Sequence, residues 1–450
     1  MLGKPTGYGP GRGRDPTPGA PAAGICNLPS TIHPLTGPCA SATFRDMRSA
    51  PRRPGPDSQR PEFATLELDR RRFLVVLGGL AALQAAAPAI AWAKRAANTL
   101  PALQPWSLPD ALPANPFEAG RALVGAAVLA PSYFNAQPWR FEVDPGEVRV
   151  LLDAQRTLPL ADPDQRFAQM SLGAALENLL VASRAWGQQP SVRYLPWGTA
   201  LRPGSSLVAA AVSWQPAERS RDRLLYSALT ERRSNPHPFD GRAIAIQSRT
   251  QLLAQVGEEV RVHWLEDRDD VRAVADIAHD GVEAVMADKR AQAERSAWLR
   301  GSDGDMRDHG DGVTAERMGL GGPARWFAGH SLSPDSHFYG WGSSSLAKDT
   351  RDLVRSSGAL ALLTLPQRSD AGWLMGGQAY ERFALRAATL GVAQHPLAAP
   401  IASERHRLSL AQRFHAEGEE PLLLVRLGHA KSPSPTARRG VALVSTYRTS

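Results

Sequence analysis

The spacing of apolar residues along the chain alternates between a helical period and the short runs that are typical of strands. Helical spacing predicts five helices, at 119–129, 171–186, 221–229, 269–290 and 376–390. Short apolar runs predict strands at 191–195, 207–214, 260–265, 359–365 and 421–427. A further pair of apolar runs flanks the turn sequence Asp144-Pro145-Gly146-Glu147, so that 139–153 is predicted to be a hairpin. A mixture of helices and strands of this kind predicts an α+β fold.

One helical pattern occurs twice in the chain. The segments 173–177 and 377–381 share the pattern Gly-x-Ala-x-Glu, and a glycine closes each helix at the same spacing, at Gly187 and Gly391. Chance could supply one such pair in an alanine-rich chain, but the matching context favours a duplication. We therefore predict two related halves, at 117–220 and 221–450.

The first 116 residues differ from the rest in composition. Residues 1–68 are rich in Pro, Gly, Ser and Arg, which predicts a disordered tail. A long tail ahead of the signal described next is unusual, and translation that starts internally, for example at Met47, would explain it. Five prolines within 94–116 predict a stiff, extended linker.

Residues 69–93 have the order of a secretory signal: a basic region, an apolar stretch that ends near Trp92, and a closing Ala91-Trp92-Ala93. The core Arg70-Arg71-Arg72-Phe73-Leu74 resembles a twin-arginine signal, which directs folded proteins to an export system. The alternative is a membrane anchor, because the run approaches the ~20 residues that span a bilayer. Two glycines, a glutamine and a proline within the run weaken that alternative.

Net charge is concentrated in the same front region. The chain has 450 residues, 52 Lys and Arg, 44 Asp and Glu, and a formal charge of +8. The first 95 residues hold thirteen of these basic and six of these acidic residues, which leaves 39 basic against 38 acidic residues for the rest. The body is therefore nearly neutral, and the composition gives no support for nucleic-acid binding. Both cysteines, Cys26 and Cys39, also lie in the front region.

The most distinctive polar string, at 130–141, lies between a predicted helix and a predicted strand. It contains Ser132, Asn135 and Gln137, which offer uncharged donors and acceptors, and it is stiffened by Pro131 and Pro138. Such a loop suits a flat ligand with polar edges. The alternative is a loop whose polar groups satisfy only its own backbone.

A second string, at 231–239, contains Arg232, Arg233 and Ser234 just after a predicted helix. Two guanidinium groups and a hydroxyl could bind a phosphate through charge-assisted hydrogen bonds. The alternative is a solvated arginine pair that interacts favourably with the helix C-terminus. The late basic pair Arg438-Arg439 has the same two interpretations.

Together these strings resemble the nitroreductase family of flavoproteins over about 117–440. The segment Ala-Pro-Ser-x-x-Asn-x-Gln-Pro-Trp-x-Phe is the specific part of the resemblance, and the Arg-Arg-Ser string, the Gly-x-Ala helix and the late basic pair are weaker parts. In the family the Arg-Arg-Ser string comes first, whereas here it comes second. The reversed order fits the Acg-type branch, in which two nitroreductase-like halves are fused as a pseudo-dimer.

The resemblance implies a site for FMN with residues from both halves. Arg232, Arg233, Ser234 and Arg438 or Arg439 would hold the phosphate. Ser132, Asn135 and Gln137 would contact the ribityl chain or the ring edge, and the backbone of Pro396 and Leu397 would lie beside the reactive part of the ring. Each chain would then hold one complete FMN site and could act as a monomer. The flavin carries the redox step in such proteins, so that no catalytic side chain is named.

Other possible sites have weaker support in the sequence. The acidic segment 303–308 lacks the glycine of a calcium loop, and Thr314 stands where the bidentate glutamate belongs. The histidines 309, 330 and 337 are too widely spaced for a metal motif. The sequence has no Gly-x-Gly-x-x-Gly after a strand and no nucleophile elbow. We therefore predict no metal.

The sequence and the resemblance leave two functional hypotheses in which FMN is bound, and a third in which the chain is an interaction protein that kept the fold and lost FMN. The first is an FMN-dependent oxidoreductase that passes two electrons to a nitro, quinone or similar small acceptor, with NAD(P)H as a possible donor. The second is an exported protein that binds or sequesters FMN with little turnover, because NAD(P)H is scarce outside the cytoplasm. We expect export through the twin-arginine machinery to the periplasm or cell envelope, or a cytoplasmic protein if the signal is not used. The polar stretch 300–312 and the Gly-rich run 319–323 interrupt the second half as a surface insertion or, as we favour, a lid over the flavin.

Overall fold

The computed structural model describes residues 105–198, 207–217, 223–320 and 332–448. The chain divides into two units, 1–74 and 75–450, and every described residue belongs to the second unit. The predicted tail at 1–68, the signal at 69–93 and the first part of the linker lie outside the described residues. Among the described helices, none is both long and apolar enough to cross a membrane.

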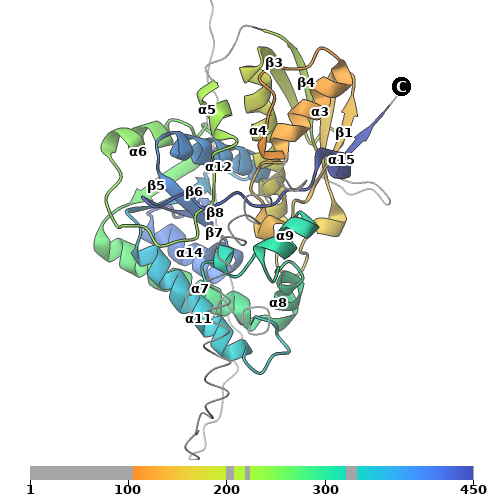
Figure 1. Cartoon of the computed structure of the whole chain (residues 1–450). Coiled ribbons are helices and arrows are strands. Elements are labelled where there is room, and N and C mark those ends of the chain that lie inside the picture. The colour runs from red at the N-terminus through yellow and green to blue at the C-terminus, as the bar shows by residue number, and fades with distance from the viewer. Residues whose placement is uncertain (1–104, 199–206, 218–222, 321–331, 449–450) are drawn as a thin grey trace, which may run out of the picture. The chain divides into compact units, whose positions relative to one another are not determined.

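The first half is built on a five-stranded sheet of order β3-β4-β2-β1-β9 (Figure 1). Its strands are β1 (Trp139–Asp144), β2 (Glu147–Leu152), β3 (Gln188–Tyr194), β4 (Val208–Pro216) and β9 (Ser445–Tyr447). β1 and β2 form the predicted hairpin, with Asp144 opposite Glu147 and a turn at Pro145 and Gly146. β9 runs parallel to β1, and the other pairs are antiparallel.

The second half is built on a four-stranded antiparallel sheet of order β5-β6-β8-β7. Its strands are β5 (Arg261–Leu265), β6 (Ala359–Leu365), β7 (Ala393–Leu397) and β8 (Glu420–Gly428). Every residue of β6 and β8 is buried, as expected for central strands that are covered on both faces.

The same strand order is present twice. In chain order, β1, β2, β3 and β4 occupy the sheet positions that β5, β6, β7 and β8 occupy in the second sheet. In each half one long helix, α4 (Arg166–Ala185) or α12 (Gly372–Thr389), stands between the second and third of these strands. This repetition confirms the predicted α+β fold with two related halves.

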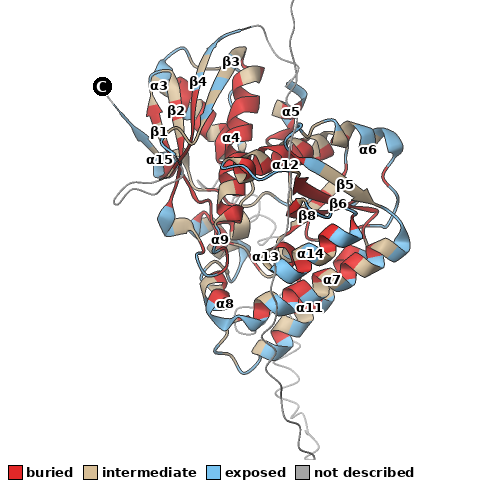
Figure 2. Cartoon of the chain, turned by 180° about the vertical axis from the view of Figure 1, so that it is seen from behind, coloured by how far each residue is buried: buried red, intermediate tan, exposed pale blue. Residues whose placement is uncertain are grey.

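Helices α4 and α12 pack against each other at the centre of this unit, and Figure 2 shows both as mainly buried. Two equivalent glycines allow the close approach. A Cβ added to Gly173 would lie 2.0 Å from the carbonyl oxygen of Leu374, and a Cβ added to Gly377 would lie 2.0 Å from that of Met170. Because Met170 and Leu374 stand three residues before these glycines, each helix presents the same surface to the other. The twice-occurring pattern therefore lies at the contact between the halves.

The remaining helices cover the outer faces of the two sheets and the region between them. They are α3 (Pro116–Ala127), α5 (Arg223–Ala228), α6 (Ile246–Leu253), α7 (Arg268–Ala287), α8 (Lys289–Ser296), α9 (Asp303–His309), α11 (Tyr339–Arg355), α13 (Ala399–Ala402), α14 (Glu404–Arg413) and α15 (Val441–Val444), with short 3₁₀ turns at η2 (Tyr133–Asn135), η3 (Ala154–Arg156) and η4 (Glu316–Met318). Side chains that accept hydrogen bonds from backbone N–H groups cap the N-termini of several helices. Asn115 caps α3, Asp267 caps α7, Asp288 caps α8 and Ser302 caps α9.

Three differences from the sequence predictions concern the site. Pro396 and Leu397, for which no strand was predicted, lie at the end of the edge strand β7 (Ala393–Leu397). The predicted second half, 221–450, also contributes a strand to the first sheet, because Ser445–Tyr447 forms β9 beside β1. The predicted linker also contributes to packing, since Trp106, Leu108 and Leu112 pack against the core of the first half.

Candidate functional site

A cavity of about 300 Å³ lies between the two halves and is the candidate site. The first half contributes one wall, made of Pro131, Ser132, Tyr133, Phe134, Phe167, Met170, Ser171 and Ala174. The second half contributes Ser234, Tyr380, the run His395–Pro400 and Leu423. The third wall comes from the region between β5 and β6 and contains Val282, Val285, Met286, Gln292, Arg295, Val313, Arg317, Met318, Leu346 and Thr350.

The lining is mainly apolar, with hydroxyl groups, one imidazole and two guanidinium groups at its edges. No acidic side chain of the described residues lines this cavity. Four of the sequence-predicted site residues meet here, namely Ser132, Ser234, Pro396 and Leu397. The other six predicted residues are not in the lining and lie behind it.

The loop that follows α3 enters the site with an unusual backbone. Phe134, Asn135 and Gln137 all have φ near +50°, a region that non-glycine residues rarely adopt. The hydroxyl of Ser132 accepts a hydrogen bond from the backbone N–H of Gln137 at 2.9 Å, which helps to hold this conformation. Strained backbone that is fixed in this way is typical of functional loops.

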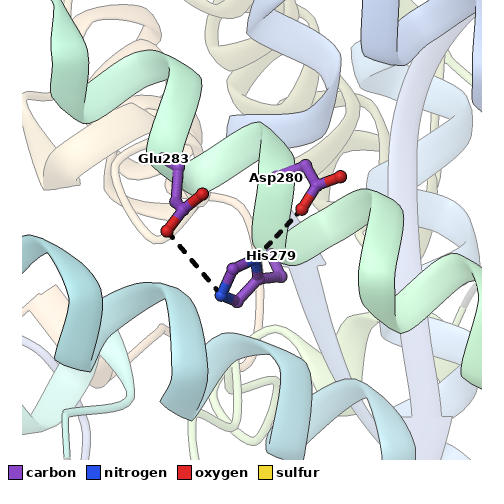
Figure 3. Close-up of side chains that lie close together, drawn as sticks. All are labelled: His279, Asp280 and Glu283. Atoms are coloured by element: carbon purple, nitrogen blue, oxygen red, sulfur yellow. Dashed lines mark hydrogen bonds and ion pairs between the residues drawn. The ribbon is translucent and has the colours of Figure 1, made fainter. Parts of the chain in front are cut away.

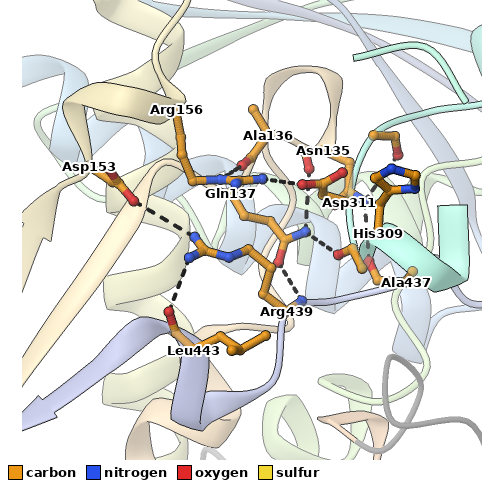
Figure 4. Close-up of polar contacts among 12 residues, drawn as sticks. Asn135, Ala136, Gln137, Asp153, Arg156, His309, Asp311, Ala437, Arg439 and Leu443 are labelled. Carbon is orange, nitrogen blue, oxygen red and sulfur yellow. Dashed lines mark hydrogen bonds and ion pairs between the residues drawn. The ribbon is translucent and has the colours of Figure 1, made fainter. Parts of the chain in front are cut away.

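Asn135 and Gln137 are buried and connect this loop to two distant segments (Figure 4). The Asn135 amide donates to the carbonyl oxygens of Gly312 and Ala437, at 3.1 and 3.2 Å. The Gln137 amide donates to the carbonyl of Gly310 at 2.8 Å, and its oxygen accepts from the backbone N–H of Arg439. Their side chains therefore fix other backbones, which neither interpretation from the sequence anticipated.

Arg439 lies beside Gln137 and Asp153 (Figure 4) and is not part of the cavity lining. Its guanidinium donates to the carbonyl of Leu443 at 3.1 Å and lies 3.9 Å from the carboxylate of Asp153. Nearby, Asp311 pairs with Arg156 and Arg300, which fixes the segment after α9 against the first half. These contacts show how the predicted insertion is attached.

Arg232 is almost fully buried between the halves. Its Nε lies 3.0 Å from the Glu381 carboxylate, and its Nη2 donates to the carbonyl of Leu129. Asn178, oriented with its amide nitrogen toward Glu381, donates at 3.0 Å and accepts from the N–H of Ala130. Burial raises the pKa of Glu381 to about 7, although the positive charge of Arg232 opposes this shift.

Arg232 belongs to a cluster of four arginines, completed by Arg233, Arg317 and Arg438, which we call the arginine cluster. Burial lowers the pKa of Arg233 to about 10, and repulsion from Arg232 and Arg317 contributes to this shift. Burial and the other three arginines lower the pKa of Arg438 as well. Trp106 covers part of the cluster, with Arg233 and Arg438 at 4.2 and 5.1 Å from its ring centre.

The arginine cluster is not fully satisfied by the described residues. Nη1 of Arg232 and Nε of Arg438 are buried there without a hydrogen-bond partner. Arg317 is the member that lines the cavity, where it donates to the carbonyl and hydroxyl oxygens of Ser434 at 3.2 and 3.1 Å. Buried cations with incomplete hydrogen bonding are costly, and a bound anion would offset that cost.

Ser234 reaches the cavity because its strand segment pairs with β7. It forms a parallel β-bridge with Gln394, whose side-chain amide donates to the carbonyl of Arg233 at 2.9 Å. The hydroxyl of Tyr380 on α12 donates to the Gln394 side-chain oxygen at 2.9 Å. Burial raises the pKa of Tyr380, so that its hydroxyl stays protonated.

His395 lines the cavity directly before Pro396. The buried Arg426 donates from Nε to His395 Nδ1 at 3.1 Å, which places the imidazole proton on Nε2. Arg426 itself is held by the carbonyl oxygens of Asn235, His237 and Leu353. Burial, with repulsion from Arg426 and His237, lowers the pKa of His395 well below its usual range, so that the ring is neutral.

Sequence reasoning missed Arg295, Arg317, Tyr380 and His395. The sequence could have shown His395, because it precedes the predicted Pro396–Leu397 backbone. Arg317 stands two residues before the Gly-rich run that was interpreted as part of an insertion or lid. Val313, Arg317 and Met318, which lie between the polar stretch 300–312 and the Gly-rich run, line the cavity, whereas no residue of 300–312 does.

One group of side chains outside the cavity has the residue types of a metal site (Figure 3). His279, Asp280 and Glu283 lie on α7, and the last two are exposed. The His279 Nδ1 lies 3.0 Å from Asp280, and its Nε2 lies 3.9 Å from Glu283. Within the described residues no further ligand joins this group, and its contacts are those of an exposed cluster of charged residues.

Comparison with curated proteins gives matches across most of the body. A Mycobacterium tuberculosis protein named Putative NAD(P)H nitroreductase Rv3131 is 27% identical over 362 residues, 76% of this chain and 94% of its own. Probable NAD(P)H nitroreductase PigM from Serratia is 26% identical over 70% of this chain and 90% of its own. Both of these relatives, which match over most of the chain, carry the name NAD(P)H nitroreductase.

Other comparisons cover less of the chain. The M. tuberculosis protein named Putative NAD(P)H nitroreductase acg is 31% identical over 153 residues, 33% of this chain and 44% of its own. Among solved structures, the FMN-dependent nitroreductase NfnB from Mycobacterium smegmatis, in complex with NADPH, matches with a TM-score of 0.32 and 12% identity, over 51% of this chain and 100% of its own. No family model matches the chain.

Proposed function

We propose that this protein is an FMN-dependent oxidoreductase that passes two electrons to a nitro, quinone or similar small acceptor. The observation that carries the proposal is the cavity between the halves. It brings Ser132, Ser234 and Pro396–Leu397 together from three distant parts of the chain. These are residues that the family resemblance assigns to the FMN site.

The lining suits FMN in shape and in chemistry. Its volume is within the usual range for cofactor pockets, and its walls are mainly aromatic and aliphatic, as a flat ring system requires. Hydroxyl groups and the imidazole of His395 line its polar edge. The arginine cluster, with unpartnered buried nitrogens, lies beside Ser234 and suits the phosphate.

Each group has a defined role in this proposal. Ser234 and Arg317 would bind the phosphate, while Arg232, Arg233 and Arg438 would supply positive charge from behind. The backbone of Pro396 and Leu397 would support the ring, and Ser132 its edge. Asn135 and Gln137 would hold the loop and the C-terminal segment in place. Bound FMN supplies hydride and electron transfer, which the protein tunes and shields.

The proposed electron donor is NAD(P)H. Two curated relatives that match most of this chain, Rv3131 and PigM, carry NAD(P)H in their names. The neutral His395 can donate from Nε2 to an oxygen within the cavity, either of the flavin or of an acceptor. The acceptor class is proposed from the same relatives and from the small, mainly apolar cavity.

Absorbance in the flavin region and anaerobic reduction test this proposal. Purified protein should contain FMN or take it up, at about one per chain, because both halves contribute to a single cavity. Addition of NADH or NADPH without oxygen should bleach the flavin, and an added nitroaromatic or quinone should restore its colour with turnover. A colourless protein that cannot be reconstituted would refute FMN binding. Bound FMN without turnover would instead support the sequestering alternative.

We also propose that residues 69–93 act as a twin-arginine signal that exports the loaded protein to the periplasm or envelope. The support is the Arg70–Leu74 core and the Ala91–Ala93 end, together with a cofactor that must be inserted before export. Fractionation of the native host tests this proposal. Replacement of Arg70 and Arg71 by Lys should retain the protein in the cytoplasm. An unchanged distribution would refute the signal.

A further inference from the structure

A second cation lines the cavity apart from the arginine cluster. Arg295 lies in the last turn of α8, is 5% exposed, and lines the cavity together with Gln292, Tyr133 and Val285. It comes from the third wall, which the region between β5 and β6 contributes. Neither the sequence motifs nor the proposed FMN contacts involve this residue.

All described hydrogen-bond partners of Arg295 are neutral. Its Nε donates to the hydroxyl of Tyr133 at 3.3 Å, and its Nη1 donates to the carbonyl oxygen of Val285 at 3.0 Å. The contacts that the described residues make with its guanidinium include no carboxylate. Because no acidic side chain of the described residues lines the cavity, the charge of Arg295 has no counterion there.

Arg295 and Arg317 are held by different parts of the molecule. Arg317 bonds to Ser434, lies 3.5 Å from Asp303 and interacts electrostatically with Arg233 and Arg438. Arg295 instead donates a hydrogen bond to the hydroxyl of Tyr133. Its positive charge opposes the burial that raises the pKa of Tyr133 and Tyr339. The cavity therefore has two separate positions for negative charge, and the phosphate of FMN would occupy only the one at Arg317.

We propose that Arg295 binds the carboxylate of the electron acceptor, so that the cavity selects anionic aromatic acceptors over neutral ones. This inference rests on the proposed function, because it assigns the substrate class of the same cavity. A planar guanidinium binds carboxylates through paired hydrogen bonds, and the surrounding aromatic and aliphatic side chains suit a flat ring. Burial of Arg295 strengthens such a contact, since solvent screens it little.

Two probes of matched size test the inference. 4-Nitrobenzoate and 4-nitrobenzamide differ mainly in charge, and their dissociation constants can be measured by calorimetry on the protein as purified. Wild-type protein should bind the benzoate at least about tenfold more tightly than the amide, as a charge-assisted hydrogen bond provides. Arg295→Gln should bring the ratio close to one, and Arg295→Lys should retain part of it. Arg290→Gln, an exposed change on the same helix, should leave it unchanged.

Several results would overturn the inference. Equal binding of the two probes by wild-type protein would do so whether or not Arg295→Gln folds. A ratio in folded Arg295→Gln equal to that of wild type would also do so. If Arg295→Gln instead changed the ratio of KM values for NADPH and NADH by about tenfold and left the probe ratio intact, Arg295 would belong to the donor and the inference would be wrong.

Flavin absorbance of the same samples separates this inference from the proposed function. Protein that lacks flavin and cannot be reconstituted with FMN, but binds 4-nitrobenzoate through Arg295, would refute the oxidoreductase proposal and support the anion site. Protein that is loaded with flavin and turns over, but does not distinguish the two probes, would refute the anion site alone.

Discussion

In the first sheet, β1 and β2 are joined by the two residues Pro145 and Gly146, whereas in the second sheet the equivalent strands β5 and β6 are joined by residues 266–358. The two sheets otherwise share their strand order, and their central helices α4 and α12 share their glycine contact. The long connection supplies a whole wall of the cavity, including Arg295 and Arg317. The halves thus keep a common framework, and the longer connection supplies the two arginines that line the cavity.

The two central glutamates show the same mixture of shared and divergent features. Glu177 on α4 accepts from Gln378 and Arg382 on α12, at 3.0 and 2.8 Å. Its equivalent, Glu381 on α12, instead pairs with Arg232, which comes from outside the helix pair. Equivalent positions therefore serve two purposes. Both connect the helices, since Glu381 also accepts from Asn178 on α4, and of the two only Glu381 connects the helix pair to the arginine cluster.

The largest expected effect follows from the symmetric helix contact. Gly173→Ala and Gly377→Ala should each lower the free energy of unfolding by about 3 kcal/mol, because the new methyl group would meet a backbone carbonyl that cannot move easily. Urea denaturation measures this loss. Gly340→Ala, with open space around its Cα in α11, is the control and should change stability by less than about 1 kcal/mol. A large loss at one central glycine and none at the other would refute the equivalence of the two helices.

The next effect concerns the half that carries the cations. Arg317→Gln should weaken FMN binding at least about tenfold, since a hydrogen bond to a charged group contributes ~1.5–3 kcal/mol. Fluorescence titration of apoprotein with FMN measures the dissociation constant. Arg121→Gln, an exposed change in the first half, is the matched control. Unchanged FMN affinity in Arg317→Gln would show that Arg317 does not bind the phosphate.

The glutamate pair provides a pH-dependent test. Folded Glu381 ionises near pH 7, whereas an ordinary glutamate ionises near pH 4.5. Between these values the folded state binds more protons than the unfolded state, so that Glu381 makes the free energy of unfolding fall as pH rises from 4.5 to 7. The slope is at most about 1.4 kcal/mol per pH unit. Below and above this window the contribution of Glu381 is constant.

Denaturation of wild type and Glu381→Gln at several pH values measures this contribution as a difference. The stability of wild type relative to the variant should fall across pH 4.5 to 7, with exposed Glu118→Gln as a control for the substitution itself. Parallel curves for wild type and Glu381→Gln would show that Glu381 keeps an ordinary pKa. The pairing with Arg232 would then outweigh burial.

The central strands β6 and β8, which sequence predicted well, are buried continuously. β6 was predicted with its observed bounds because all seven of its residues are apolar or buried. β7 was not predicted, since its Gln394, His395 and Pro396 are polar or lack a backbone donor, and only pairing with β8 reveals the strand. β9 is three residues long and depends on a partner at the other end of the described chain.

The residues of the site likewise divide into those that the local sequence predicts and those that depend on the fold. Ser132 and Ser234 were predicted from their local sequence strings, and Pro396 and Leu397 only from the family resemblance. Arg232 was predicted as a phosphate ligand, but the structure places it against Glu381, a contact that depends on the packing of α12. Arg295 and Arg317 could not be predicted, because their segments carry no motif and reach the cavity only through the fold of the long connection.

The smallest expected effect is the absence of a titration at His395. Burial and the positive charge of Arg426 keep the imidazole neutral, and the bond from Arg426 Nε fixes its proton on Nε2. Nitrogen-15 NMR of the histidine rings should therefore show one neutral Nε2–H tautomer with constant shifts from pH 5.5 to 8. The spectrum of His395→Gln assigns the signal. Arg426→Met should release the tautomer and allow the signal to move with pH, and a signal in wild type that already titrates would contradict the pairing.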